Sequence, residues 1–124
     1  MQTRFTDSLQ NALISAQSIA VGHENSFIDP LHVMSALLQA EGSAVSHWFV
    51  SLGVDLPKFK KALEAAIQKL PTVEGRADLT MNPELHRVLN KADKLSQDRK
   101  DAYISSELFI LAAAMEKGSL GQLL

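Results

Sequence analysis

Apolar residues recur along this chain every three or four positions, the spacing that places side chains on one face of an α-helix. Several of these periodic stretches follow a residue that can cap a helix, and Asp29 and Asn82 are each followed by a first-turn proline. The pattern predicts helices that begin just after Thr6, Asp29, Ser43, Asp55, Asn82 and Ser105, with a seventh that begins at Gly118 and Ser119. We therefore expect an all-α fold.

The helical pattern repeats with an offset of 76 residues. Matching positions include the turns between the helices as well as the apolar stripes, which indicates a duplicated unit rather than a shared helical period. The matched pairs are Leu13 and Leu89, Ala16 and Ala92, Ile19 and Leu95, Ile28 and Ile104, Ala36 and Ala112, Gly42 and Gly118, and Ser43 and Ser119. The prediction is a fold of duplicated four-helix repeats related by a pseudo-two-fold axis.

The repeat boundaries follow from this offset. Repeat one is expected to span residues 1–71, a polar linker that contains Gly75 spans 72–81, and repeat two spans 82–124 of this single domain. Leu124 aligns with Trp48, so we expect repeat two to be incomplete in this chain. An eighth helix, equivalent to residues 55–70, would then follow Leu124.

Composition narrows the class of protein. The chain has 124 residues and is 46% hydrophobic, which is enough for one compact core. It has no cysteine, which excludes disulfides and thiolate chemistry and makes the cytoplasm the default location. No segment has the pattern of a leader or a membrane span, so we expect a soluble protein. Twelve basic and fourteen acidic residues without a long single-sign block indicate no nucleic-acid partner.

Motifs for catalysis and metal binding are missing from the sequence. It contains no GxxxxGK[ST] phosphate loop and no GxSxG element, and its four histidines do not have HExxH spacing. The carboxylates stand at helix starts or on polar faces. We therefore expect no catalytic residue, no metal site and no cofactor in this domain.

Three stretches carry a family resemblance: FTDSLQNALISAQSIAVGHENSFIDPLHVMSALL, LPTVEG and RVLNKADKLSQDRKDAYISSELFILAAA. They resemble the duplicated N-terminal domain of Clp chaperone ATPases over almost the whole chain. The LPTVEG and ISSELF segments are more similar to the ClpB disaggregases than to the ClpA and ClpC relatives. The resemblance implies a domain joined by a flexible linker to a hexameric two-ring ATPase, in which ATP and magnesium bind to other domains.

The resemblance also implies partners. Such a machine threads unfolded or aggregated polypeptides through its pore with help from a DnaK-type chaperone system. The isolated domain is expected to be a monomer and the full-length protein a homohexamer. The alternative function is an adaptor-docking or pore-gating module of the ClpA or ClpC type, in which polar faces dominate binding.

A binding surface is expected where the fifth and sixth predicted helices meet. The stretch 108–115 is apolar on every face, which predicts either a central helix that is buried all round or one that leaves an edge near its N-terminus open as an apolar contact surface, and both can hold along different turns. The short connection 98–105 brings Leu95 and Leu108 to one corner, where an apolar groove could form. The first copy has no equivalent combination of two leucines and two acids there, because His32 takes the place of Leu108.

Resemblance to ClpB N-terminal domains implies substrate contact at this corner, with Thr6 nearby and with Asp101 and Glu107 as a polar rim. Ordinary roles compete for each residue: helix capping and dipole complementation for Thr6 and Glu107, and a turn role for Asp101. Lys91, one turn before Leu95, departs from the apolar pattern, so its charge narrows the groove or only its aliphatic stem contributes. Trp48 is a weaker surface candidate, since Trp48 and Phe49 cannot both face the core.

Overall fold

The computed structural model describes residues 4–40, 44–74 and 79–124, which form six α-helices and no β-strand. The all-α prediction is confirmed. The helices begin where five of the predicted caps stand, whereas Gly42, Ser43 and Gly75 lie outside the described residues. Their bounds are α1 Asp7–Gly22, α2 Pro30–Gln39, α3 Ala44–Ser51, α4 Leu56–Gln68, α5 Pro83–Asp98 and α6 Ser106–Glu116.

The helices of the two repeats are capped in the same way at their N-termini, by a side chain that accepts a hydrogen bond from a backbone amide in the first turn. Thr6 accepts from Leu9 N at the start of α1, and its equivalent Asn82 accepts from Leu85 N at the start of α5. Asp29 and its equivalent Ser105 do the same for α2 and α6. The local sequence therefore fixes where each helix begins.

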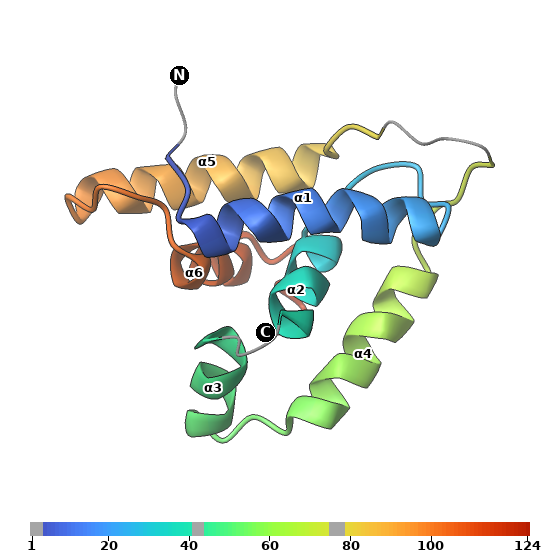
Figure 1. Ribbon diagram of the computed structural model, residues 1–124, viewed down its shortest axis with the longest axis horizontal. Helices are drawn as coiled ribbons and strands as arrows, with labels where there is room; N and C mark the ends of the chain where they lie inside the picture. Colours follow the sequence, from blue (N-terminus) through green and yellow to red (C-terminus); the bar gives the residue numbers. More distant parts are fainter. Residues whose placement is uncertain (1–3, 41–43, 75–78) are drawn as a thin grey trace.

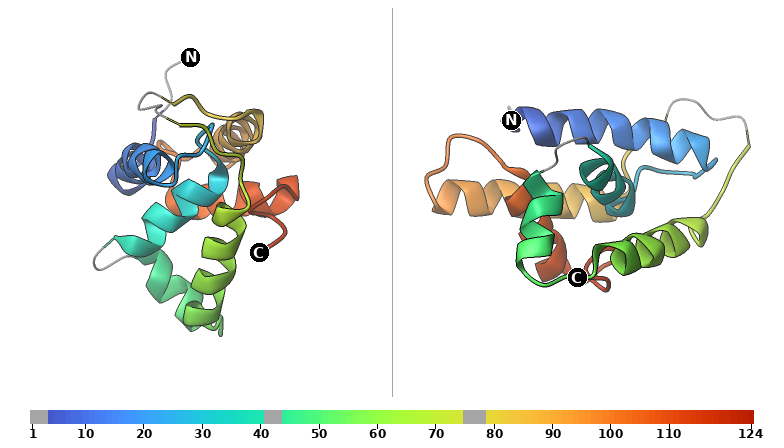
Figure 2. Two further views of the ribbon diagram at one scale, coloured as in Figure 1. Left: turned by 90° about the vertical axis from the view of Figure 1, so that its right-hand side faces the viewer. Right: turned by 60° about the horizontal axis from the view of Figure 1, so that its bottom comes forward.

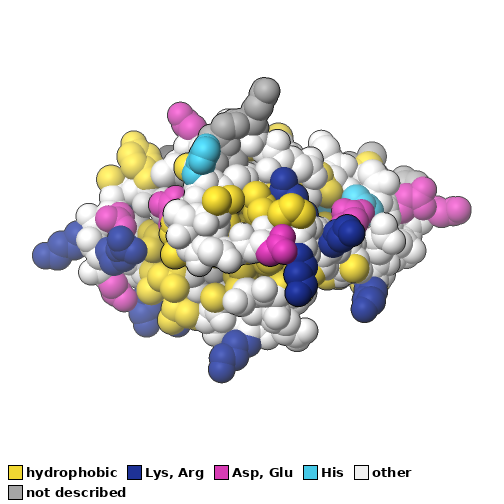
Figure 3. Space-filling view, turned by 90° about the horizontal axis from the view of Figure 1, so that it is seen from below, with side chains coloured by type: hydrophobic (Ala, Val, Ile, Leu, Met, Phe, Trp, Pro, Cys, Tyr) yellow, Lys and Arg dark blue, Asp and Glu magenta, His cyan; other side chains and the backbone are white. Residues whose placement is uncertain are grey.

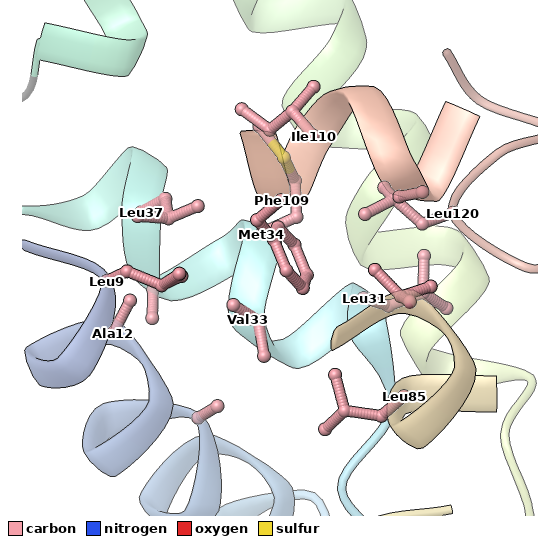
Figure 4. Packing of buried hydrophobic residues seen from close by; sticks show 14 of the residues in the cluster. Leu9, Ala12, Leu31, Val33, Met34, Leu37, Leu85, Phe109, Ile110 and Leu120 are labelled. Atoms are coloured by element: carbon pink, nitrogen blue, oxygen red, sulfur yellow. The ribbon is translucent and has the colours of Figure 1, made fainter. Parts of the chain in front are cut away.

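Helix α2 occupies the centre of the molecule and contacts the five other helices. Figure 1 shows α1 and α5 running in opposite directions along one side, with α3 and α4 on the other, and Figure 2 shows α2 between these two groups. Every residue from Pro30 to Leu38 is buried, which explains why the whole segment is apolar apart from His32 and Ser35. In Figure 4, Met34 of α2 and Phe109 of α6 lie side by side in the core.

Two short backbone bridges join the repeats in a crossed arrangement. Phe5 pairs in parallel with Ile104, and 76 residues further on Met81 pairs in parallel with Ile28. Each bridge has two backbone hydrogen bonds, with N–O distances between 2.7 and 3.0 Å. The arm that precedes the first helix of each repeat therefore pairs with the loop of the other repeat, as a pseudo-two-fold axis requires.

The segment after α6 differs from the prediction of a seventh helix at Gly118 and Ser119. Residues 117–123 form hydrogen-bonded turns. Lys117 has a φ of 56°, the left-handed conformation that ends a helix. The Glu84 carboxylate then accepts hydrogen bonds from the backbone amide of Ser119 at 2.8 Å and from its hydroxyl at 2.7 Å. The Gln122 amide donates to the Gly118 carbonyl at 3.1 Å, so a single turn follows the Glu84 contact, and the described residues contain no seventh α-helix.

Candidate functional site

The two loops between helices at pseudo-equivalent places have the same backbone shape. We call residues 23–29, between α1 and α2, the first corner, and residues 99–105, between α5 and α6, the second corner. Glu24 and its equivalent Lys100 both adopt left-handed backbone conformations, with φ of 55° and 60°. Each corner also exposes an aromatic side chain, Phe27 at 49% and Tyr103 at 57%. The corners therefore differ in their surroundings rather than in their backbone.

The first corner is closed by the segment that follows α4. Residues 71–73, which we call the strap, pair in antiparallel fashion with residues 24–26. The Ser26 amide donates to the Pro71 carbonyl at 3.1 Å, and the Val73 amide donates to the Glu24 carbonyl at 2.7 Å. The strap thereby satisfies the outward-facing backbone groups of this corner.

Buried side chains hold the strap in place. Asn25 is only 2% exposed and donates from its amide nitrogen to the Pro71 carbonyl at 3.3 Å. His32 lies below it with no exposed surface. Its Nδ1 accepts from the Asp29 amide at 2.9 Å, so its Nε2 carries the proton and donates to Asn25 Oδ1 at 2.8 Å. Burial lowers the pKa of His32 to about 4, so the imidazole is neutral at pH 7.

The second corner lacks this closure within the described residues. Asp101 stands in place of Asn25, and Leu108 in place of His32. Neither the backbone N–H of Ala102 nor the carbonyl of Lys100 has a hydrogen-bond partner in the described part of the chain. The loop itself is held from inside, because the Ser96 hydroxyl reaches the Asp101 carbonyl at 3.2 Å. The second corner is therefore ordered, and these two backbone groups are unpaired among the described residues.

Hydrogen bonds place three of the six predicted site residues near this corner, namely Thr6, Leu95 and Asp101. The Thr6 amide donates to the Ile104 carbonyl at 3.0 Å, which places the start of α1 beside the second corner. The Asp101 amide donates to the Ser96 carbonyl, one residue beyond the partly buried Leu95. Glu107 is exposed on the first turn of α6. No hydrogen bond or ion pair within residues 4–40, 44–74 and 79–124 joins Glu107 or Lys91 to the others.

Leu108 differs from the expectation of an exposed groove residue, since it is only 2% exposed. It occupies the third position of α6, and its equivalent His32 is equally buried in α2. The chain start covers this turn, as the Ser8 and Ser106 hydroxyls lie 3.3 Å apart. The open edge of α6 lies further along, at Leu111 and Met115, which are 43% and 48% exposed. Leu108 therefore supports the second corner from beneath.

Sequence reasoning missed two exposed residues of the second corner, Ala102 and Tyr103. The duplication contained a signal for them, because Phe27 and Tyr103 are aromatic residues at matching positions. The Trp48 candidate has a weaker case in the structure. Its neighbour Phe49 is 4% exposed and packs edge-on against Phe59 at 5.4 Å between ring centroids, while Trp48 is half-buried against the core.

Other kinds of site find no support in the described ranges. Within them, no group of three or more His, Cys, Asp or Glu side chains is placed to hold a metal ion. No helix there has both the length and the apolar character to cross a bilayer. On the face seen in Figure 3, hydrophobic side chains form several groups with charged side chains between them.

The fold is a small all-α domain built from two related helical repeats, and comparison with known proteins identifies its family. The family model described as Clp repeat (R) N-terminal domain matches residues 4–124, and the chain belongs to this family. It is 40% identical over 121 residues to the chaperone protein ClpB of Vibrio vulnificus strain YJ016, which covers 97% of this chain. It is 42% identical over 125 residues to ClpB of Dichelobacter nodosus, which covers 100%. The chain spans 14% of the length of each relative.

Solved structures show the same fold. The N-terminal domain of Hsp104 from Candida albicans superposes with a TM-score of 0.85 at 22% identity, covering 97% of this chain and 79% of that one. The N-terminal domain of the ClpV1 ATPase from E. coli gives a TM-score of 0.83 at 20% identity, covering 98% and 77%. At these identities the likeness establishes the fold.

Proposed function

We propose that this chain is the substrate-binding and regulatory N-terminal domain of an ATP-dependent disaggregase of the ClpB type. It engages exposed apolar segments of unfolded or aggregated polypeptides at the second corner. The domain itself is non-catalytic, while ATP and magnesium act in ATPase domains elsewhere in the full-length protein. That protein is a cytoplasmic homohexamer that works with a DnaK-type chaperone system.

The difference between the two corners is the observation that carries this proposal. They share a backbone shape and an exposed aromatic residue, and within residues 4–40, 44–74 and 79–124 the strap and the Asn25 and His32 pair close the first corner alone. The second leaves Tyr103 and two backbone hydrogen-bonding groups accessible.

The chemistry of the second corner favours weak and sequence-tolerant binding. Tyr103 offers apolar ring area with a polar end, and the half-buried Leu95 adds aliphatic surface. Asp101 and Glu107 form the polar rim, and the aliphatic stem of Lys91 extends the apolar part. Covering a few hundred Å² at about 25 cal/mol/Å² gives several kcal/mol, most of which is offset by the entropy of association. Weak binding allows a chaperone to release its client.

A pair of matched variants tests the proposal. Tyr103→Ser removes the exposed ring of the second corner, whereas Phe27→Ser removes its equivalent in the first. With a reduced and carboxymethylated protein as an unfolded client, we expect Tyr103→Ser to weaken binding about threefold to tenfold, and Phe27→Ser to leave it unchanged. NMR shift mapping on the same samples should show changes at Thr6, Leu95 and Asp101. Equal effects of both variants, or shifts confined to other surfaces, would refute the proposal.

One observation favours the alternative of an adaptor-docking or gating module. Arg87, Lys91 and Lys94 lie at helical spacing along α5, and none has an ion-pair partner within the described residues. A docking partner with an acidic surface would bind this stripe. Such binding would weaken strongly with salt and would respond to Lys94→Ala rather than to Tyr103→Ser.

A further inference from the structure

The strap of the first corner is the end of a short chain of hydrogen bonds that starts at a buried imidazole. Nε2 of His32 donates to Oδ1 of Asn25 at 2.8 Å, and the amide nitrogen of Asn25 donates to the Pro71 carbonyl at 3.3 Å. The Asn25 amide can donate to the strap because its oxygen faces His32. The imidazole therefore sets the orientation of the side chain that holds the strap.

The same imidazole also completes the start of α2. Nδ1 of His32 accepts a hydrogen bond from the Asp29 amide at 2.9 Å. A second proton on the ring would lie on this nitrogen and point at the Asp29 N–H, so two donors would meet. Protonation of His32 thus requires the ring to leave its place, and the contact with Asn25 is then lost.

The strap can separate from the first corner at little cost in packing. Residues 71–73 are all exposed, and two backbone hydrogen bonds hold them, between Ser26 and Pro71 and between Val73 and Glu24. By contrast, α2 is buried over almost its whole length. Local opening takes place where few apolar contacts are lost. We therefore expect the strap to open before the helices.

We propose that residues 71–73 form an acid-released latch, which leaves the first corner when His32 takes up a proton while the helices stay folded. Opening uncovers the Glu24 carbonyl and the Ser26 amide, and it lengthens the connection between α4 and α5. The latch couples the protonation of one buried side chain to the link between the two repeats. This inference concerns the first corner and is independent of client binding at the second.

Burial is the main reason why the closed latch excludes the proton. It lowers the pKa of His32 to about 4, and the Asp29 carboxylate, which acts in the opposite direction, offsets this in part. That carboxylate already accepts three hydrogen bonds, from the Leu31 amide, the Asn82 side chain and the Ser119 hydroxyl, which Glu84 of α5 also contacts. The acid groups near His32 are therefore occupied elsewhere.

A second histidine acts on His32 from the end of α1. His23 lowers the pKa of His32. The pKa of His23 is itself raised by hydrogen bonds to the Ile19 carbonyl and to Glu64 of α4, so His23 becomes charged before His32 as the pH falls. A charged His23 opposes another charge in the closed corner and favours release.

The pKa difference between the closed and open states sets the size of the effect. His32 has a pKa of about 4 in the closed corner and an ordinary value of 6.5 in water, so a falling pH favours opening between these values. From this difference, the open fraction of the strap should rise about twentyfold from pH 7 to pH 5. Above about pH 6.5 the latch stays closed.

Hydrogen exchange of the whole chain provides the first test. The Ser26 and Val73 amides are the two backbone donors of the latch, so their protection factors should fall together, about twentyfold between pH 7 and pH 5. Amides at the centre of α2 should stay at least about tenfold better protected at both pH values, because the helices remain folded. Equal protection of the strap and α2, or strap protection that does not change with pH, would overturn the inference.

A pair of variants provides the second test. His32→Gln keeps both hydrogen bonds, because a glutamine there can accept from the Asp29 amide and donate to Asn25, but it does not titrate. Val73 protection in His32→Gln should stay within about threefold of the parent at pH 7 and should not fall at pH 5. Asn25→Ala removes the link between the ring and the strap, so Val73 should be about tenfold less protected already at pH 7.

Three results would refute the latch. A fall in Val73 protection that persists in His32→Gln would assign the pH response to another group. Unchanged protection in Asn25→Ala would show that the backbone bonds alone hold the strap. In the parent chain, NMR titration of the His32 ring should follow the loss of Val73 protection over the same pH range, and a ring that titrates while Val73 stays protected would also contradict the proposal.

Discussion

Nε2 of His32 lies 2.8 Å from Oδ1 of Asn25, and this contact closes the first corner from within. The other imidazole nitrogen accepts a hydrogen bond from the Asp29 amide. A protonated imidazole has no acceptor nitrogen, so the network requires the neutral form of His32. The side chain that holds the strap is therefore also a titratable group whose charge the fold excludes.

This arrangement makes the stability of the domain sensitive to mild acid. The pKa of His32 is about 4 in the folded chain and near 6.5 when unfolded, so between these values the unfolded state binds more protons. Stability is complete above about pH 6.5 and falls as the pH decreases towards 4. We expect a loss of about 2 kcal/mol between pH 7 and pH 5, measured by urea unfolding at both values.

The His32→Leu variant isolates this effect, since it places in the first corner the residue type that Leu108 contributes to the second. We expect lower stability at pH 7, by about 1–3 kcal/mol, because Asn25 and the Asp29 amide lose a partner. The fall between pH 7 and pH 5 should largely disappear. If it persisted in His32→Leu, another group would be responsible.

His23 should behave in the opposite way. Its ring is hydrogen-bonded to the Ile19 carbonyl and to Glu64, and these contacts raise its pKa. A raised pKa gives stability that is present at low pH and is lost as the pH rises through it. The pair is largely exposed, so this amounts to less than about 1 kcal/mol. In an NMR titration, Glu64→Gln should move the His23 midpoint down.

The close packing of Gly118 against the carboxylate of Glu84 provides a third prediction. A β-carbon at position 118 would overlap this side chain, whereas one at Gly22 would meet nothing within 4 Å. Gly118→Ala should therefore cost about 1–3 kcal/mol in thermal or urea unfolding, and Gly22→Ala should cost nothing. In a Glu84→Ala background most of the penalty should vanish. An additive double variant would show that another contact restricts Gly118.

The crossed bridges predict equivalent roles for Ile28 and Ile104, which are 6% and 1% exposed. Replacing either with alanine should destabilise the domain by about 2–5 kcal/mol, and the two costs should agree within about 1 kcal/mol. The control Ile14→Ala, at a side chain that is 64% exposed, should have little effect. A large difference between the two isoleucines would contradict a symmetric role for the arms.

The sequence predicted the parts of the fold that are determined locally. Asp29, Asn82 and Ser105 cap helices because their side chains accept hydrogen bonds from backbone amides in the first turn, and this contact depends only on the local sequence. The all-α class and the duplication followed from periodicity and offset. The seventh helix expected at Gly118 and Ser119 is present only as hydrogen-bonded turns, in which the Gln122 amide donates to the Gly118 carbonyl.

Side-chain exposure at the candidate site was harder to predict than its position. The expected corner between α5 and α6 exists, but helical periodicity cannot tell which apolar face the chain start covers. Leu108 is therefore buried, and Tyr103 is the exposed residue. The exposure of a backbone group, such as the Ala102 N–H, cannot be predicted from amino-acid composition. In the structure, the matching amide of Ser26 is paired with the strap, whereas the Ala102 amide has no partner among the described residues.

The crossed bridges of Phe5 with Ile104 and Met81 with Ile28 have a consequence for the origin of the fold. Two separate copies of one repeat, related by a two-fold axis, would exchange their N-terminal arms in this same way. The domain thus has the form of an ancestral dimer whose subunits became covalently joined. Once the subunits were one gene, the two corners were free to diverge. The first corner now carries Asn25 and His32, and the second carries Asp101 and Leu108 at the matching positions.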